Sequence, residues 1–185
     1  MYQVFCDANI LYDPRLPDVQ VIDPTLVQKK NEPGELTFGI PKSHTGYSGI
    51  EKLKSRVKVY RDGTLIWMGR ILQDERDLYE TKQVSAEGAL GFLLDSIIRP
   101  FEFDGSPADL LAQIVASHNA QVNENQRFIM GNVTVTGVIH RSSVDYLSAW
   151  QTISTRLLDE LGGYLLVRFD DQPGPCSDAG SDRRR

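Results

Sequence analysis

The stretch that decides the fold is Val57-Lys58-Val59-Tyr60-Arg61-Asp62-Gly63-Thr64-Leu65-Ile66-Trp67-Met68-Gly69-Arg70-Ile71-Leu72. It contains two strand-like segments on either side of Asp62-Gly63, a pair that supplies the positive φ needed by a tight hairpin turn. The second segment, residues 65–72, is apolar on both faces, unlike a strand with one face in water. We therefore predict a β-hairpin whose second strand is covered on both faces.

Similar short β-like segments, separated by turn residues, fill the chain from Met1 to about residue 98, as is typical of an all-β unit. An apolar cluster at 88–95 favours a short helix that closes the sheet. Residues 1–98 are therefore expected to form a β-barrel-like first domain. Its candidate strands are 3–6, 19–27 with an interruption near Pro24, 35–40, 56–60, 65–72 and 83–86.

Residues 99–170 are expected to begin a second, mixed region. Ser106-Pro107-Ala108-Asp109 is typical of a helix start, with Ser as cap and Pro at the first helical position. A second helix is predicted from a cap at Ser143 to Gly162-Gly163, which would end it. Strands are predicted at 128–136 and 164–169. The predicted fold class is thus α+β and mainly antiparallel, with the strands concentrated in the first domain.

The last residues, 171–185, combine Gly, Pro, Ser and charge, a composition typical of disorder. A strand such as 164–169 normally needs a later hairpin partner. This favours the interpretation that the natural protein continues and that the tail is foreign or out of frame. A natural flexible linker is the alternative.

Charge and hydropathy exclude several classes of function. The chain has 185 residues, 24% of them charged, and a formal net charge of -5, so it lacks the basic excess needed to bind duplex nucleic acid directly. Its apolar runs fall well short of the ~20 residues that span a bilayer, so no membrane insertion is expected. The N-terminus has no pattern of a secretory signal, which predicts synthesis in a reducing cytoplasm.

Residues suited to catalysis or metal binding are few and scattered. Cys6 and Cys176 lie far apart, and we interpret Cys6 as a small buried side chain. The histidines His44, His118 and His140 stand in no zinc-like or nucleophile–base arrangement. His118 ends the first predicted helix, where a cationic ring would favour the helix C-terminus. The sequence therefore predicts no enzyme, no metal and no cofactor.

Strand 65–72 also suggests an assembly surface. Strict alternation would turn Leu65, Trp67 and Ile71 toward the core and leave three apolar side chains on the other face. A neighbouring subunit could cover that face, which makes it a candidate subunit interface. The chain's own helix around 90–94 is the alternative cover. The candidate interface residues are Ile66, Met68 and Leu72.

Several segments together resemble a known family. The hairpin quoted above is one of them, and the others are Pro33-Gly34-Glu35-Leu36-Thr37-Phe38, Val84-Ser85-Ala86-Glu87-Gly88-Ala89-Leu90-Gly91-Phe92-Leu93-Leu94-Asp95-Ser96, Ser117-His118-Asn119-Ala120-Gln121-Val122, Gly131-Asn132-Val133-Thr134-Val135 and Gly162-Gly163-Tyr164-Leu165-Leu166-Val167-Arg168. In order and spacing they resemble the N-terminal part of siphophage and prophage tail-tip proteins. These are called tail-associated lysins, tail endopeptidases or minor structural proteins, and they are similar to baseplate hubs. The resemblance covers about residues 1–170.

The resemblance implies a structural part of a phage virion tail: a homotrimeric baseplate hub that closes the tail tube and continues it. The partners it implies are other copies of the chain, as a homotrimer of the full-length protein, and the distal tail, tail tube and tape measure proteins. It brings no catalytic residues, because any hydrolase in such proteins lies in a separate C-terminal domain. The alternatives are a cell-wall (peptidoglycan) hydrolase and a carbohydrate-binding module, the latter suggested by Trp67, Trp150 and the tyrosines.

Overall fold

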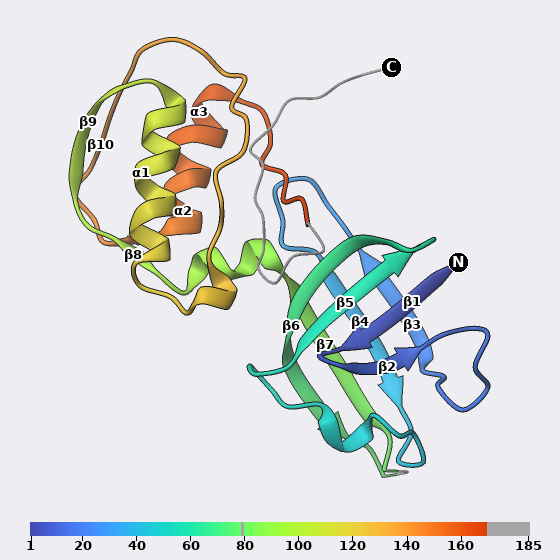
Figure 1. The fold of residues 1–185 in the computed structure, drawn as a ribbon. Coiled ribbons are helices and arrows are strands. Elements are labelled where there is room, and N and C mark those ends of the chain that lie inside the picture. Colours follow the sequence, from blue (N-terminus) through green and yellow to red (C-terminus); the bar gives the residue numbers. More distant parts are fainter. Residues whose placement is uncertain (79, 170–185) are drawn as a thin grey trace. The chain divides into compact units, whose positions relative to one another are not determined.

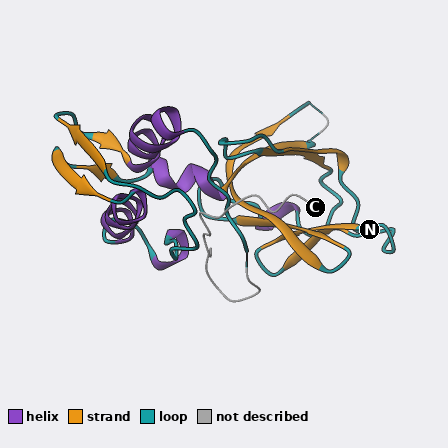
Figure 2. Cartoon of the chain, turned by 90° about the horizontal axis from the view of Figure 1, so that it is seen from above, coloured by secondary structure: helices purple, strands orange, loops and turns teal. Residues whose placement is uncertain are grey.

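The structure is a computed structural model that describes residues 1–78 and 80–169, so the expected disorder of 171–185 lies outside the described residues. The chain divides into two compact units, Met1–Ala89 and Leu90–Arg185. The first is a curled antiparallel sheet, and the second combines helices with two small antiparallel sheets (Figures 1 and 2). The predicted α+β class, with a barrel-like first part, is confirmed.

The first unit is built on one sheet of seven strands in the order β2-β1-β5-β6-β7-β4-β3. All its neighbouring strands run antiparallel. Every strand predicted for this unit is present, although the one predicted at 19–27 begins at Ile22, and β2 is a strand that the sequence patterns did not indicate. The strands are β1 (Tyr2–Cys6), β2 (Asn9–Tyr12), β3 (Ile22–Val27), β4 (Glu35–Ile40), β5 (Arg56–Arg61), β6 (Thr64–Arg76) and β7 (Lys82–Gly88), with a short 3-10 helix at Tyr47–Gly49.

Strand β6 is the longest and serves two neighbours. Its first part pairs with β5 and its second part with β7, and the two ladders overlap at Gly69 and Arg70. The predicted hairpin turn before it is confirmed, since Asp62 and Gly63 have φ of 52° and 79°. Because one strand passes from one partner to the next, the sheet curls around a single core.

The side chain of Trp67 lies in that core and packs against three glycines. Its side chain is 2% exposed, and its indole nitrogen has no hydrogen-bond partner in the described part of the chain. Gly69 and Gly88 are opposite each other on β6 and β7, and a Cβ on either would come within 3 Å of the indole. A Cβ on Gly34 would lie 3.3 Å from it. Three glycines thus make the space for this ring.

The same core buries Cys6, as predicted. Burial together with the Asp7 carboxylate raises the pKa of the Cys6 thiol to about 11.

The second unit packs helices beside two short ladders. Strand β8 pairs with β11, and β9 pairs with β10. The helix that begins at α2 passes through a π-helical turn at Ser154–Leu158 and ends at α3. The elements are β8 (Ile97–Ile98), β9 (Phe101–Gly105), α1 (Pro107–Asn119), β10 (Ile139–Ser143), β11 (Leu147–Ser148), α2 (Ala149–Ile153) and α3 (Asp159–Leu161), with 3-10 helices at Ala89–Leu94 and Glu124–Gln126.

Helix α1 starts as predicted, with Ser106 capping the backbone N–H of Asp109 and Pro107 in the first turn. At the other end of α1, two side-chain amides each bond the backbone N–H and C=O of one residue, as a neighbouring strand would. The amide of Asn119 accepts from the N–H of Phe128 at 2.9 Å and donates to its carbonyl at 2.7 Å. The amide of Gln121 bonds both backbone groups of Ile97 in the same way, at 3.0 and 2.9 Å. These two amides fasten the chain before and after α1 to the end of the helix.

Three predictions for the second unit are wrong. Ser143 belongs to β10 and caps no helix; the cap is Ser148, which forms a capping box with Gln151. Residues 128–136 and 164–169 contain no strand, apart from a single bridge residue at Arg168. The side chains there fit a strand, but a strand exists only where a neighbouring ladder satisfies its backbone groups.

Substitution of Gly88 tests whether the close packing of Trp67 against glycines stabilises the first unit. A Cβ at Gly88 would lie 1.8 Å from the carbonyl oxygen of Pro33 and 2.8 Å from Trp67 Nε1. We expect Gly88→Ala to lower the free energy of unfolding by about 3 kcal/mol, because backbone cannot move away cheaply. Gly49→Ala is the control, because its nearest contact is the flexible end of Asn9 at 3.1 Å. Urea denaturation followed by circular dichroism measures both; equal losses would contradict the packing role of Gly88.

Candidate functional site

The candidate interface residues on β6 do not share one face, because β6 carries two bulges. Val59 pairs with Trp67 and Tyr60 with Leu65, which leaves Ile66 as an extra residue without an opposite. Ile71 pairs with Ala86 and Gln73 with Ser85, which leaves Leu72 in the same position further along. The strict alternation predicted for 65–72 is therefore wrong at both residues.

The bulges change where the three side chains lie. Ile66 packs against the core cluster of the first unit and lines its cavity. Met68 pairs with Lys58 on the face opposite Trp67 and is 2% exposed, while Leu72 is half-buried. A subunit interface at Ile66, Met68 and Leu72 stays a prediction.

The curl of the sheet brings its two ends to one cavity of about 530 Å³. Tyr2, Val4 and Tyr12 line it from the β1–β2 end of the sheet. Pro24, Leu26 and Leu36 line it from the β3–β4 end, and the middle strands contribute Val59, Arg61 and Ile66. The sheet is thus an open barrel, and this cavity marks the seam where its two edge strands approach without pairing.

Part of the β3 edge is closed to pairing with a further strand. Strands β2 and β3 end the strand order, so each has a ladder on one side only within the described residues. In β3 the ladder skips from Ile22 to Thr25, across Asp23 with a φ of 46° and Pro24. Proline lacks an N–H, and a bulge bends the edge away, so this part of β3 is protected from pairing. Residues 25–27 remain as its open part.

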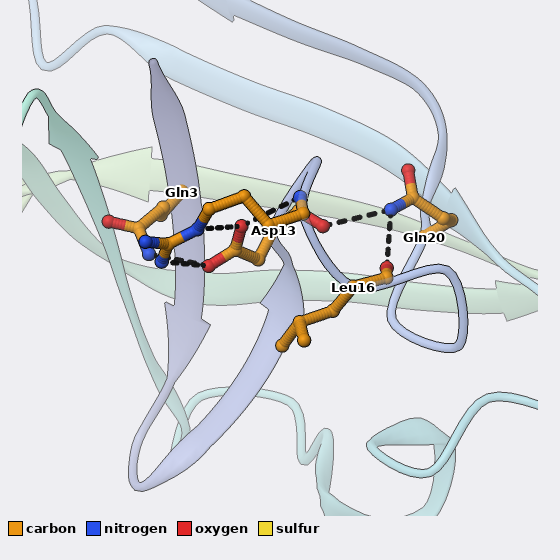
Figure 3. Close-up of polar contacts among 5 residues, drawn as sticks. Gln3, Asp13, Leu16 and Gln20 are labelled. Carbon is orange, nitrogen blue, oxygen red and sulfur yellow. Dashed lines mark hydrogen bonds and ion pairs between the residues drawn. The ribbon is translucent and has the colours of Figure 1, made fainter.

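A buried carboxylate orders the loop that joins these two edge strands. Asp13, 1% exposed, accepts from Arg15 through the backbone N–H at 3.0 Å and through the guanidinium at 2.9 and 2.6 Å, and from Gln3 at 2.7 Å (Figure 3). Gln20 donates to the carbonyls of Asp13 and Leu16. The Arg15 guanidinium and the backbone N–H of Arg15 hold the pKa of the Asp13 carboxyl well below its usual range. This Asp13 cluster fixes the loop across the seam.

His118 is buried rather than placed as a cation at the helix end. Its Nε2 donates to the carbonyl of Gln126 at 3.0 Å, so Nδ1 of the neutral ring accepts from the Ser96 hydroxyl at 2.7 Å. Burial lowers its pKa, which favours the neutral ring. The predicted role through positive charge is wrong, because the ring acts as a neutral bridge between three segments. His44 likewise lies between the Leu11 carbonyl and the Gly46 N–H, each 2.9 Å away.

Two histidine pairs in the described residues were candidates for acid–base chemistry. Ser96 and His118 resemble a nucleophile and its base, but they are 1% and 0% exposed and the second ring nitrogen is bonded to a carbonyl. The His140–Asp104 pair is exposed on the β9–β10 ladder. No group of three His, Cys, Asp or Glu side chains in residues 1–78 and 80–169 could hold a metal ion. None of the described helices is long and apolar enough to cross a membrane.

The Asp13 cluster predicts a pH-dependent effect of Asp13→Asn. The carboxylate is stabilised in the folded chain, so its contribution is full above the ordinary Asp pKa of 3.8 and is lost as the pH falls below it. We expect the variant to have a lower melting temperature at neutral pH, with faster amide hydrogen exchange in residues 13–21, and the difference from wild type to narrow below that pH. Asp18→Asn, an exposed residue of the same loop, is the control. A pH-independent difference would exclude the ionic role.

The His118 bridge predicts that stability falls on acidification. A folded-state pKa below the ordinary 6.5 means that the unfolded chain binds the extra proton, so stability is lost as the pH falls below that value. Melting temperatures between about pH 7 and about pH 5 should therefore decrease, and His118→Gln should remove most of the decrease. His140→Gln should retain it, because His140 is exposed. If His118→Gln keeps the full decrease, the bridge is not its cause.

The fold is similar to that of three solved tail proteins. They are prophage tail protein gp18 from Listeria monocytogenes (15% identity, TM-score 0.60), a tail protein from Neisseria meningitidis (12%, 0.60) and the 43 kDa tail protein of prophage MuSo2 from Shewanella oneidensis (14%, 0.58). The similarity covers 96%, 95% and 95% of this chain, and 50%, 50% and 53% of those proteins. The chain therefore spans about half of their length. No protein-family model and no curated protein sequence matches the chain. At these identities the similarity establishes the fold that the chain shares with phage tail proteins.

Proposed function

We propose that the chain is a structural component of a phage or prophage tail tip, the N-terminal part of a homotrimeric baseplate hub that closes and continues the tail tube. The observation that carries the proposal is the similarity of nearly the whole chain to three tail proteins. The hub position rests on the sequence resemblance to tail-tip proteins. The chain would then be made in the host cytoplasm and end in the virion tail.

The open barrel supports an assembly role. A sheet with two terminal strands presents backbone donors and acceptors that another chain can pair with. Residues 25–27 of β3 lie beside the seam cavity, and β2 is at the other side of the same cavity. The partners we propose are two further copies of the chain, and distal tail, tail tube and tape measure proteins around them. Leu72 and the neighbouring Ile66 and Met68 remain candidates for a further contact.

Neither alternative has an observation that favours it over a structural role. A peptidoglycan hydrolase needs an accessible acid, base or nucleophile. Ser96–His118 is closed to solvent, and the exposed His140–Asp104 pair belongs to no group of three possible metal ligands in the described residues. A carbohydrate-binding module needs aromatic rings that sugars can reach. Trp67, one of the rings that suggested it, is 2% exposed, while Tyr2 and Tyr146 are 49% and 69% exposed. A role without catalysis is therefore the one that we propose.

Light scattering on the purified chain tests the trimer. We expect a mass of three times the 20.8 kDa of one chain. Val27→Lys places a charge on the open part of the β3 edge, where Val27 is 42% exposed, and should give a monomer with an unchanged melting temperature. Val144→Lys, at an 84% exposed position of the second unit, is the control and should leave the trimer intact. A monomeric wild type would count against the trimer, and a trimeric Val27→Lys against this edge.

A further inference from the structure

One segment of the second unit has the side chains of a strand but no strand partner. Residues 132–136, Asn-Val-Thr-Val-Thr, are rich in β-branched side chains and lie between Gly131 and Gly137, which has a φ of 117°. They belong to no ladder, and none of the five makes a hydrogen bond within the described part of the chain. Four of the five are exposed and Val133 is half-buried. Their backbone donors and acceptors are therefore available to another strand.

The same segment forms one wall of an apolar groove. Val133, Thr134 and Val135 line a cavity of about 310 Å³. Helix α1 contributes Pro107 and Leu111 to it. The helix from α2 to α3 contributes a row of aliphatic side chains, Ile153, Leu157, Leu158 and Leu161. A strand added beside 132–136 would gain backbone hydrogen bonds and a place for apolar side chains at once.

We propose that the occupant is a second copy of the chain, with the two 132–136 segments paired antiparallel across a two-fold axis. The stretch 128–139 contains no charged residue and no proline, so two identical strands would meet without like-charge repulsion. With Thr134 opposite Thr134, each Val133 is opposite Val135 and each Asn132 opposite Thr136. The valines then share one face of the paired strands, and the polar side chains share the other.

The proposed contact buries little surface, so we expect its affinity to be low. Five paired residues and one groove bury less than the ~1,200–2,000 Å² of a standard stable interface. We therefore expect a weak dimer, with a dissociation constant on the order of 100 µM. This contact is separate from the trimer proposed above, because it uses the second unit and a two-fold axis.

Proline substitution tests the strand pairing. Neighbouring N–H groups point to opposite edges of a strand, so Thr134→Pro and Val135→Pro between them remove a donor on either edge. Sedimentation velocity at protein concentrations up to about 1 mM should show that wild type associates beyond the mass that it has at low concentration. At least one proline variant should raise the dissociation constant of this further association about tenfold or more. Thr134→Ala and Val135→Ala are matched controls that keep the N–H, and melting curves confirm that the variants fold. Unchanged association of both proline variants would overturn the proposal.

Disulfide cross-linking tests the register. On a Cys176→Ser background, with Cys6 buried, Thr134→Cys should form a covalent dimer under mild oxidation, since directly opposite Cβ atoms lie ~4.5–5.5 Å apart. Thr136→Cys should cross-link only when mixed with Asn132→Cys. No cross-link at 134, or a wild type without any dimer up to about 1 mM, would refute the two-fold contact. Because the two contacts are separate, both proline variants should leave the proposed trimer intact, so a failure of the two-fold contact would leave the proposed function untouched. Loss of the trimer in both variants would contradict this separation.

Discussion

The packing of the Trp67 indole on glycines is the constraint on which the first unit depends. Gly69 and Gly88 face each other where β6 passes from its ladder with β5 to its ladder with β7. Without side chains there, the two strands and the 33–34 backbone approach closely, and Gly34 accepts a hydrogen bond from Gly88. The indole fills the space that the glycines leave. A larger residue at either position would separate the strands at the point where the sheet has to turn.

The curl has a second consequence at the ends of the sheet. It brings β2 and β3 to one cavity, yet leaves them unpaired with each other. The loop between them is held in place by the buried carboxylate of Asp13 and its partners. A barrel that closed on itself would offer no backbone to a neighbour. The open seam leaves β2 and β3 each with a ladder on one side only within the described residues.

Local patterns predicted much of this fold. The Asp62-Gly63 turn, the strands around it and the start of α1 at Ser106-Pro107 all follow from residues close together in the chain. The bulges at Ile66 and Leu72 could not be found in this way, because a bulge is a property of the pairing between two strands. The missing strands at 128–136 and 164–169 have the same cause, since their composition was interpreted without knowing their neighbours. The cap at Ser148 was visible as Ser-x-x-Gln and was missed in favour of Ser143.

Each unit contains one of the two tryptophans. Trp67 lies in the core of the first unit, and Trp150 is half-buried on α2 in the second. An indole that is shielded from water and lacks a hydrogen-bond acceptor emits fluorescence at shorter wavelengths than one that water can reach. The chain therefore carries an intrinsic optical probe of the first unit, distinguishable in colour from the signal of the second. Emission spectra alone can report whether the two units unfold together or in sequence, without any label attached to the protein.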